Sequence, residues 1–577
     1  MSKIESASSL VGFEILKIAL VLGLLGDVLL RATPWGLNVL LFNLAFVVGF
    51  AALLWRHDPR RLTLSTVALM GAQVFFAAMF VWRDSDELKV ADTVAIIAIL
   101  SIQLLPQLGV TQRLAGMFHY VIGFLWSALS AMFAPAALLT SDIQWSGMPD
   151  KGWRKHAVGA LRGVAIATPL VLIFGGLFVA ADAAYEGMVA RALNIDFETV
   201  FSHGILLAIF SWLSMGYLRG VVISPLGSAD VPVDESVIPE TQKTHVSDVV
   251  ADAGEPPVRL PDNRTVIEHL NISDEPNAKE VAAGDAPSEP RKDWAWSDIT
   301  NSVLPQAFTL GTTEVAVILG AMNLLFLSFV IVQVPYLFGG MELVQTTPDF
   351  KLAEYARRGF GELVAVSALV LPTLLIGQWL IRKEATRAQL LFKVLAGTQI
   401  ALLFVIMASA VQRLLILTGS LGYGMTTIRL YPMIFMTWLA VVFVWFGATV
   451  LRGARQYFAW GALWSAIVIL GATHVLNPDA FIVKTNLELM RQGRTFDADY
   501  NASLSDDSLP VLIGSFAELS NEDQIKAYSR LKQRYCQKQF WNSDLRSWNV
   551  DRRTALQSIE PFAEVLAHGC VGVTREE

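Results

Sequence analysis

The sequence predicts an all-α integral membrane protein, a bundle of about 11 transmembrane helices (range about 10 to 12) followed by a small, soluble, helical C-terminal domain. Of its 577 residues, 54% are hydrophobic and 16% are charged, and the mean hydropathy is +0.49. A soluble domain carries about a quarter charged residues, so this composition exceeds what a water-soluble core needs. Apolar runs of about 20 residues, long enough to cross a bilayer core, recur between short charged turns.

Four spans are predicted in the N-terminal membrane region, residues 1–112. They cover about residues 11–30, 37–55, 62–82 and 91–110. A basic turn with Arg60 and Arg61 separates the second and third spans, and an acidic turn that starts at Arg83 separates the third and fourth. Because basic loops are retained in the cytoplasm, this alternation predicts a cytoplasmic N-terminus.

The segment formed by residues 113–157 is predicted to be an interfacial or re-entrant helix followed by a basic loop. Its apolar run, residues 116–139, is long enough to span, but His119 and Pro135 interrupt it. An interfacial helix keeps the flanking basic residues in the cytoplasm, so we favour it over a true span. A pair of spans, residues 158–226, follows.

An acidic, proline-rich segment, residues 227–298, separates the two membrane regions. It holds 16 acidic and 6 basic residues with eight prolines, so it cannot bury enough apolar surface to offset the entropy lost on folding. We expect a disordered cytoplasmic linker, a candidate binding segment for a cytoplasmic protein. The chain has a net charge of −7. It has no basic cluster suited to a nucleic-acid backbone, which argues against nucleic acid as a partner.

Five further spans are predicted in residues 299–477, and the soluble helical domain in residues 478–577. The spans cover about residues 311–337, 361–381, 390–417, 430–451 and 457–475. A helix capped near Ser520 is expected in the soluble domain. The odd number of spans predicts that this domain is periplasmic, in a bacterial inner (cytoplasmic) membrane. Cys536 and Cys570 would form a disulfide there; two reduced, buried cysteines are the alternative.

Several motifs of the second membrane region form a recognisable set. They are Glu314, Asn323, Gln333, Tyr336 to Gly340, Glu354 to Leu363, Arg429 to Tyr431, Leu476 to Asp479, Asn486, Asp497 to Tyr500 and Leu504 to Asp507. This set resembles the bacterial polytopic membrane family called domain of unknown function 4173, over about residues 311–512, with a looser match upstream. The resemblance implies a shared multi-span membrane domain in which the acidic linker is dispensable. It carries over no activity and no catalytic residue.

Ionisable residues at the ends of the later spans are the candidate ligand-binding residues. A charged side chain is costly to place within a membrane, so its presence there suggests a function. Glu314, near the start of a span, would accept a proton or cation, or would simply be a carboxylate at a helix N-terminus. Glu354 lies three and four residues before Arg357 and Arg358, with Glu362 following. These arginines would hold an anionic group such as a lipid headgroup, or would pair with nearby carboxylates.

Transport-like handling of a small solute or ion is the favoured function, because of the buried charges and proline-broken spans. An envelope sensor or scaffold is the alternative, and a membrane-embedded enzyme acting on a lipid-linked substrate is less favoured, since no nucleophile and base occur at a recognisable spacing. The expected partners are membrane lipids and a small solute or ion. No cofactor and no metal site are predicted. In particular, His203 and His474 are isolated in the sequence and are predicted to be packed or interfacial histidines.

Overall fold

The computed structural model describes residues 2–143, 197–223, 309–338, 360–381, 386–420, 424–536 and 544–562. All of them belong to one compact unit, formed by Met1–Pro225 and Trp296–Glu577. Most of the predicted pair of spans in residues 158–226 and the acidic linker lie outside the described residues. Cys570 and the predicted binding residues Glu354, Arg357 and Arg358 also lie outside them.

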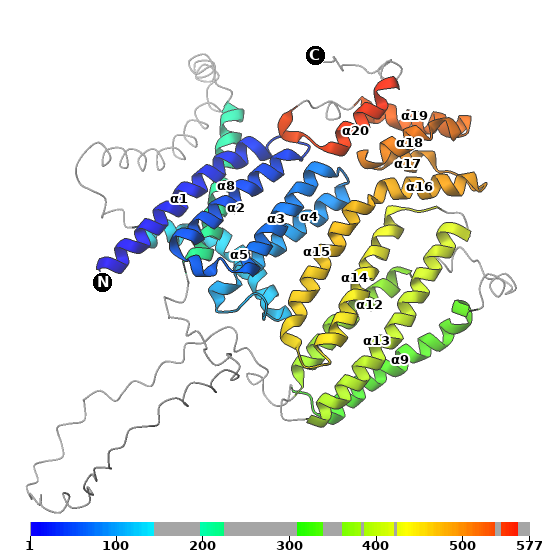
Figure 1. The fold of residues 1–577 in the computed structure, drawn as a ribbon, viewed down its shortest axis with the longest axis horizontal. Coiled ribbons are helices and arrows are strands. Elements are labelled where there is room, and N and C mark those ends of the chain that lie inside the picture. Colours follow the sequence, from blue (N-terminus) through cyan, green and yellow to red (C-terminus); the bar gives the residue numbers. More distant parts are fainter. Residues whose placement is uncertain are drawn as a thin grey trace, which may run out of the picture. The chain divides into compact units, whose positions relative to one another are not determined.

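The described part of the chain is helical and contains no strand (Figure 1). Its first half comprises α1 (Ser2–Leu30), α2 (Leu37–His57), α3 (Leu64–Trp82), α4 (Asp86–Gln103), α5 (Met117–Ala137) and α8 (Phe197–Val222). Its second half comprises α9 (Thr312–Phe338), α12 (Phe360–Leu380), α13 (Thr386–Leu415), α14 (Thr427–Thr449) and α15 (Phe458–Leu476).

Within the described residues, 10 helices are long and apolar enough to cross a membrane. The chain is therefore an all-α, multi-pass membrane protein, and the predicted fold class is confirmed. The predicted first span, in α1, is not among these helices; it carries Glu14, Lys17 and Asp27. Large buried side chains hold the bundle together, among them Phe50, Phe76, Phe80, Phe443 and Phe446.

A smaller group of helices follows the last span. It comprises α16 (Pro478–Arg491), α17 (Ala498–Ser503), α18 (Leu509–Gly514), α19 (Asn521–Tyr535) and α20 (Val550–Ile559). The chain turns sharply from α15 into α16 at Asn477, whose φ is 53° and whose side chain accepts a hydrogen bond from the Ala480 amide at 3.2 Å. Pro478 occupies the first turn of α16, where its missing N–H costs nothing. The predicted cap at Ser520 is confirmed. Ser520 directly precedes α19, and its hydroxyl accepts a hydrogen bond from the amide of Asp523 in the first turn.

The helices α16 to α20 cover one end of the membrane bundle, which we call the capped end. The backbone amide of Leu37 donates to the Trp548 carbonyl at 3.0 Å, which joins the α1–α2 turn to the segment before α20. The side-chain amide of Asn549 donates to the carbonyls of Phe80 and Arg83, each at 2.8 Å, at the end of α3. The segment that precedes α20 is therefore hydrogen-bonded to both the α1–α2 turn and the α3–α4 turn.

Helix α5 begins and ends at the opposite end of the bundle from the cap. Near its start, a Cβ atom on Gly123 would lie 3.0 Å from the Ser101 carbonyl in the last turn of α4. Just after its end, Asp142 pairs with Arg219 in the last turn of α8 at 2.6 Å. Met117–Asp142 is apolar and long enough to span, so these contacts do not distinguish the predicted interfacial or re-entrant helix from a true span. Its position in a bilayer stays a prediction.

Candidate functional site

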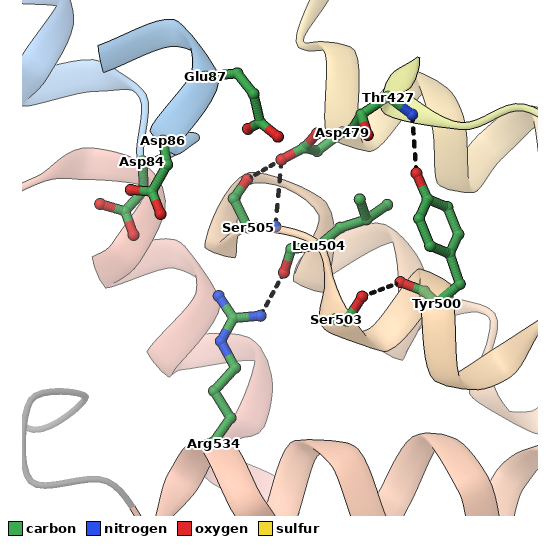
Figure 2. A pocket seen from close by; sticks show the side chains of 10 residues that line it. All are labelled: Asp84, Asp86, Glu87, Thr427, Asp479, Tyr500, Ser503, Leu504, Ser505 and Arg534. Atoms are coloured by element: carbon green, nitrogen blue, oxygen red, sulfur yellow. Dashed lines mark hydrogen bonds between the residues drawn. The ribbon is translucent and has the colours of Figure 1, made fainter. Parts of the chain in front are cut away.

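A polar pocket of about 400 cubic ångströms opens at the capped end, between the α3–α4 turn, the start of α14 and the C-terminal helices (Figure 2). It is lined by four carboxylates, one guanidinium and several hydroxyl groups. The carboxylates are Asp84, Asp86, Glu87 and Asp479, and the guanidinium is that of Arg534. The pocket is therefore acidic, and its volume lies at the lower end of the roughly 300 to 1,000 cubic ångströms that small-molecule sites occupy.

Asp479, in the first turn of α16, is the buried carboxylate of this pocket, with an exposed fraction of 1%. Its Oδ2 accepts hydrogen bonds from the amide and hydroxyl of Ser505. Its Oδ1 has no hydrogen-bond partner among the described residues. Burial raises the pKa of Asp479 and the charge of Glu87 adds to the rise, whereas the bonds from Ser505 oppose it. One buried oxygen is thus left for a proton or a ligand.

Asp86 and Glu87 are the exposed carboxylates of the pocket. Both lie in the first turn of α4, where a carboxylate is favoured by the helix dipole. Glu87 accepts a hydrogen bond from the Ser85 hydroxyl at 3.0 Å, and in Figure 2 its carboxylate faces Asp479. Neither Asp86 nor Glu87 forms an ion pair within the part of the chain that the structure describes.

The basic groups near the pocket are already occupied. Asp84 is neutralised by Lys89 at 2.6 Å and by Arg552. Arg534 donates to the Leu504 carbonyl and pairs with Asp506. The carboxylates of Asp86, Glu87 and Asp479 are therefore uncompensated by any contacting cation among the described residues.

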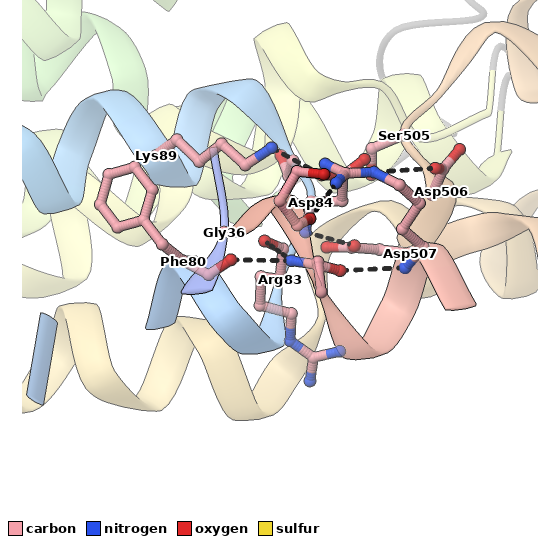
Figure 3. Close-up of polar contacts among 12 residues, drawn as sticks. Gly36, Phe80, Arg83, Asp84, Lys89, Ser505, Asp506 and Asp507 are labelled. Carbon is pink, nitrogen blue, oxygen red and sulfur yellow. Dashed lines mark hydrogen bonds and ion pairs between the residues drawn. The ribbon is translucent and has the colours of Figure 1, made fainter. Parts of the chain in front are cut away.

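A buried ionic network lies beneath the pocket (Figure 3). Asp506 lies between Arg534 and Arg552, and burial raises its pKa to about 7 although both arginines oppose the rise. Asp507 accepts from the Asp84 amide at 2.7 Å with Oδ1, while its Oδ2 has no hydrogen-bond partner among the described residues. Burial, together with the charges of neighbouring carboxylates, raises the pKa of Asp507 to about 8.

Arg83 links three parts of the molecule. Its Nε donates to the His474 carbonyl in α15 at 2.8 Å, and its Nη1 lies 2.7 Å from Asp551 in α20. Arg83 itself ends α3 and is 6% exposed. A shift of the C-terminal helices would therefore be felt by α3 and α15 through one buried guanidinium.

Close packing at Gly36 gives a first prediction. A Cβ atom on Gly36 would lie 2.4 Å from the Trp548 carbonyl oxygen, a backbone atom that cannot rotate away. We expect Gly36→Ala to weaken the docking of α20 by about 1 to 3 kcal/mol, the usual cost of overpacking. Faster amide hydrogen exchange in α20 would report it. Gly71→Ala is the matched control, because a Cβ atom there meets nothing within 4 Å. Equal exchange in both variants would contradict the prediction.

The predicted binding residues are not brought together within the described structure. Glu314 is exposed in the first turn of α9 and accepts a hydrogen bond from the Gly311 amide at 3.0 Å, as expected of a carboxylate at a helix start. Glu362 is exposed in the first turn of α12. The Leu310 amide bonds to the Leu380 carbonyl at 2.8 Å, so α9 starts where α12 ends. Glu314 and Glu362 thus lie at opposite ends of α12, roughly 30 Å apart.

His474 is fully buried, as predicted for a packed histidine, and both histidines, although isolated in the sequence, lie against a carboxylate in the structure. His203 Nδ1 lies 2.6 Å from Asp27 Oδ2, and His474 Nε2 lies 3.1 Å from Asp92 Oδ2. Each partner comes from a distant helix, so no sequence spacing reveals it. Among the described residues, no group of three or more His, Cys, Asp or Glu side chains is arranged to hold a metal ion. Cys536 follows α19, and its predicted disulfide with Cys570 stays a prediction.

In the sequence, the pocket residues occur only within larger motifs. The segment from Arg83 to Glu87 is an acidic turn between two predicted spans, and Asp479, Asp506 and Asp507 contribute only to a family resemblance. One local signal is that Asp506 and Asp507 stand just before the apolar start of α18, whose Leu509 and Leu512 are fully buried.

The family model described as Domain of unknown function (DUF4153) matches residues 69–240 and 282–514, more than half of the chain. The chain belongs to this family. The predicted resemblance to domain of unknown function 4173 was therefore wrong; short motifs between apolar spans discriminate poorly, because all polytopic proteins share the composition of the spans. No curated protein and no solved structure matches the chain. The DUF4153 segments contain Asp84, Asp479 and Asp507, whereas α19 and α20 lie beyond them.

Proposed function

We propose that this DUF4153 protein is a receptor of a bacterial inner membrane that binds a small organic cation in the acidic pocket. The observation that carries the proposal is Asp479, a carboxylate that is 1% exposed, lines the pocket and has one oxygen without a hydrogen-bond partner among the described residues. Leaving one oxygen of a buried carboxylate without a hydrogen-bond partner is costly, so a cationic or protonated ligand at this position is favoured.

The charge distribution supports a periplasmic position for the pocket. Arg60 and Arg61 lie between α2 and α3, and Arg452 and Arg455 lie between α14 and α15. Both turns are at the end opposite the cap, and basic turns remain in the cytoplasm. This orientation gives a cytoplasmic N-terminus and a periplasmic C-terminal domain.

The lining favours a solute that carries an ammonium group. Three carboxylates without contacting cations attract positive charge, and charge-assisted hydrogen bonds from N–H donors to carboxylates are the stronger kind. The hydroxyls of Tyr500, Ser503 and Ser505 offer further hydrogen bonds. A volume of about 400 cubic ångströms accommodates a molecule of several heavy atoms, such as a short diamine.

The position of the pocket favours reception over the predicted transport. Transporters place their substrate sites near the bilayer midplane, between broken helices. Here the carboxylates stand at the start of α4 and beyond the end of α15. An occupant would contact the α3–α4 turn, the start of α14 and the C-terminal helices together. It would shift the helices toward the arrangement that binds it more tightly, which is the expected action of a sensor.

The proposal is tested with the purified full-length chain in lipid nanodiscs and the probes putrescine and spermidine. We expect both amines to raise the unfolding temperature and to bind measurably by calorimetry, because they bind only the folded pocket. Asp479→Asn is expected to weaken binding at least about 10-fold, since a hydrogen bond to a charged group contributes roughly 1.5 to 3 kcal/mol.

Two controls separate this outcome from general electrostatic attraction. Asp499→Asn removes a carboxylate from the same group of helices, on a side chain that is 68% exposed, and should leave binding unchanged. The uncharged analogue 1,4-butanediol should not bind. Equal amine affinity in the Asp479 and Asp499 variants, or no binding to the unaltered protein, would contradict the proposal.

A further inference from the structure

A second cavity lies on the apolar surface between α14 and α15, far from the acidic pocket. This cavity, which we call the groove, has a volume of about 400 cubic ångströms and is lined by Ala440, Val441, Val444, Trp445, Gly461 and Ser465. The side chains of Val441 and Val444 are exposed on a membrane-crossing helix, Val444 by 64%. The groove therefore faces the bilayer.

The one hydroxyl group in the lining of this groove, that of Ser465, already has hydrogen-bond partners. The hydroxyl of Ser465 donates to the Ala462 carbonyl at 2.8 Å and accepts from the Trp438 indole at 3.1 Å. It has little to offer a polar ligand. The groove is thus suited to an apolar chain, and the depth of the apolar lining depends on Gly461, where a Cβ atom would lie 2.1 Å from Nε1 of Trp445.

Two arginines stand in the turn that joins the same two helices. Arg452 and Arg455 are both exposed. Neither forms an ion pair within the described residues. No Asp or Glu occurs anywhere between Thr427 and Pro478, so neither helix supplies a local partner. Arg452 lies seven residues beyond Trp445, roughly 10 Å along the helix direction. An anionic group held there would lie near the end of α14 that follows the groove-lining residues.

We infer that the groove and the two arginines form a binding site for an anionic phospholipid. The acyl chain occupies the groove between α14 and α15, and the headgroup phosphate is bound by Arg452 and Arg455. Arginine suits this role because its planar guanidinium binds phosphate oxygens in a bidentate manner. Exposed Tyr457 lies in the same turn, at the level where aromatic residues gather at membrane interfaces. The site is at the opposite end from the acidic pocket and does not depend on the proposed receptor function.

The test is native mass spectrometry of the delipidated full-length protein with added dioleoyl phosphatidylglycerol or dioleoyl phosphatidylcholine, which share acyl chains and differ in charge. We expect phosphatidylglycerol to bind at least about 10-fold more tightly. The double variant Arg452→Gln with Arg455→Gln should lose that preference. Both side chains are exposed, so folding should be unaffected. Inorganic phosphate should not compete, because it lacks the acyl chain.

Two further variants assign the site. Arg387→Gln with Lys393→Gln removes two exposed cations at the same end of the bundle, outside the groove, and should retain the preference. Gly461→Ala should force Trp445 into the groove and reduce binding of both lipids. The inference is overturned if the two double variants behave alike, if both lipids bind the unaltered protein equally, or if millimolar phosphate displaces the lipid.

Discussion

Arg552→Met is expected to detach the C-terminal helices from the bundle, at a cost of up to about 3 to 5 kcal/mol. Arg552 in α20 is 7% exposed, pairs with Asp84 and donates to the Ser547 carbonyl at 2.7 Å. Its Nε also lies 4.0 Å from Asp506. Methionine fills a similar volume without the charge, so Asp84 keeps only Lys89 and Asp506 keeps only Arg534 as a contacting cation. Removing one partner of a buried ion pair costs up to this much, because the carboxylates stay buried with less compensating charge.

The measurement is thermal unfolding in nanodiscs together with hydrogen exchange in α20 and at the α3–α4 turn. Arg553→Met is the matched control, since the neighbouring side chain is exposed and makes no ion pair among the described residues. We expect fast exchange at both elements in the Arg552 variant and unaltered exchange in the Arg553 variant. If both variants kept the protection of the unaltered protein, the buried network would contribute little to docking.

The stability of the capped end is expected to fall as pH rises from about 6 to about 8. Burial raises the pKa of Asp507 to about 8, whereas an unfolded aspartate titrates near about 3.9. The folded state therefore binds a proton that the unfolded state has already released. Its contribution is fully present below about pH 4 and is lost as pH rises through about 8. Across this window one such proton changes the free energy of unfolding by up to about 1.4 kcal/mol per pH unit.

Asp507→Asn tests the assignment, because the amide oxygen can still accept from the Asp84 amide but does not titrate. The variant should show a shallower fall in unfolding temperature between pH 6 and pH 8, with the remaining slope coming from Asp506, whose pKa burial raises to about 7. Its stability relative to the unaltered protein should improve as pH rises. An identical pH profile for the two proteins would show that Asp507 does not hold the proton.

The spans were predictable because crossing a bilayer sets a local requirement on the chain. About 20 consecutive apolar residues must be present in the sequence itself, whatever they pack against. The turn at Asn477 and Pro478 and the cap at Ser520 are equally local, since each depends on bonds to residues within a few positions. Among the described residues, the helices from α2 onward and these two features appear close to their predicted boundaries.

The pocket depended on contacts that no local pattern encodes. Arg83 pairs with Asp551 across 468 residues, and His474 pairs with Asp92 across 382. The sequence directed attention to Glu314 and Glu362, which lie exposed in first helical turns and need no partner. The free-energy cost of removing water from Glu314 and Glu362 is therefore small, whereas burying Asp479 and Asp507 has a large free-energy cost.

The sequence by itself determined a multi-pass helical membrane protein with a helical C-terminal extension, because hydropathy and capping act over one helix at a time. Only the tertiary structure decided that this extension closes over the α3–α4 turn and buries an acidic network there. Burial of a charge depends on which surfaces meet, and that is a property of the packed molecule rather than of any segment. Asp479, unremarkable in the sequence, becomes the central residue of the proposed site for this reason.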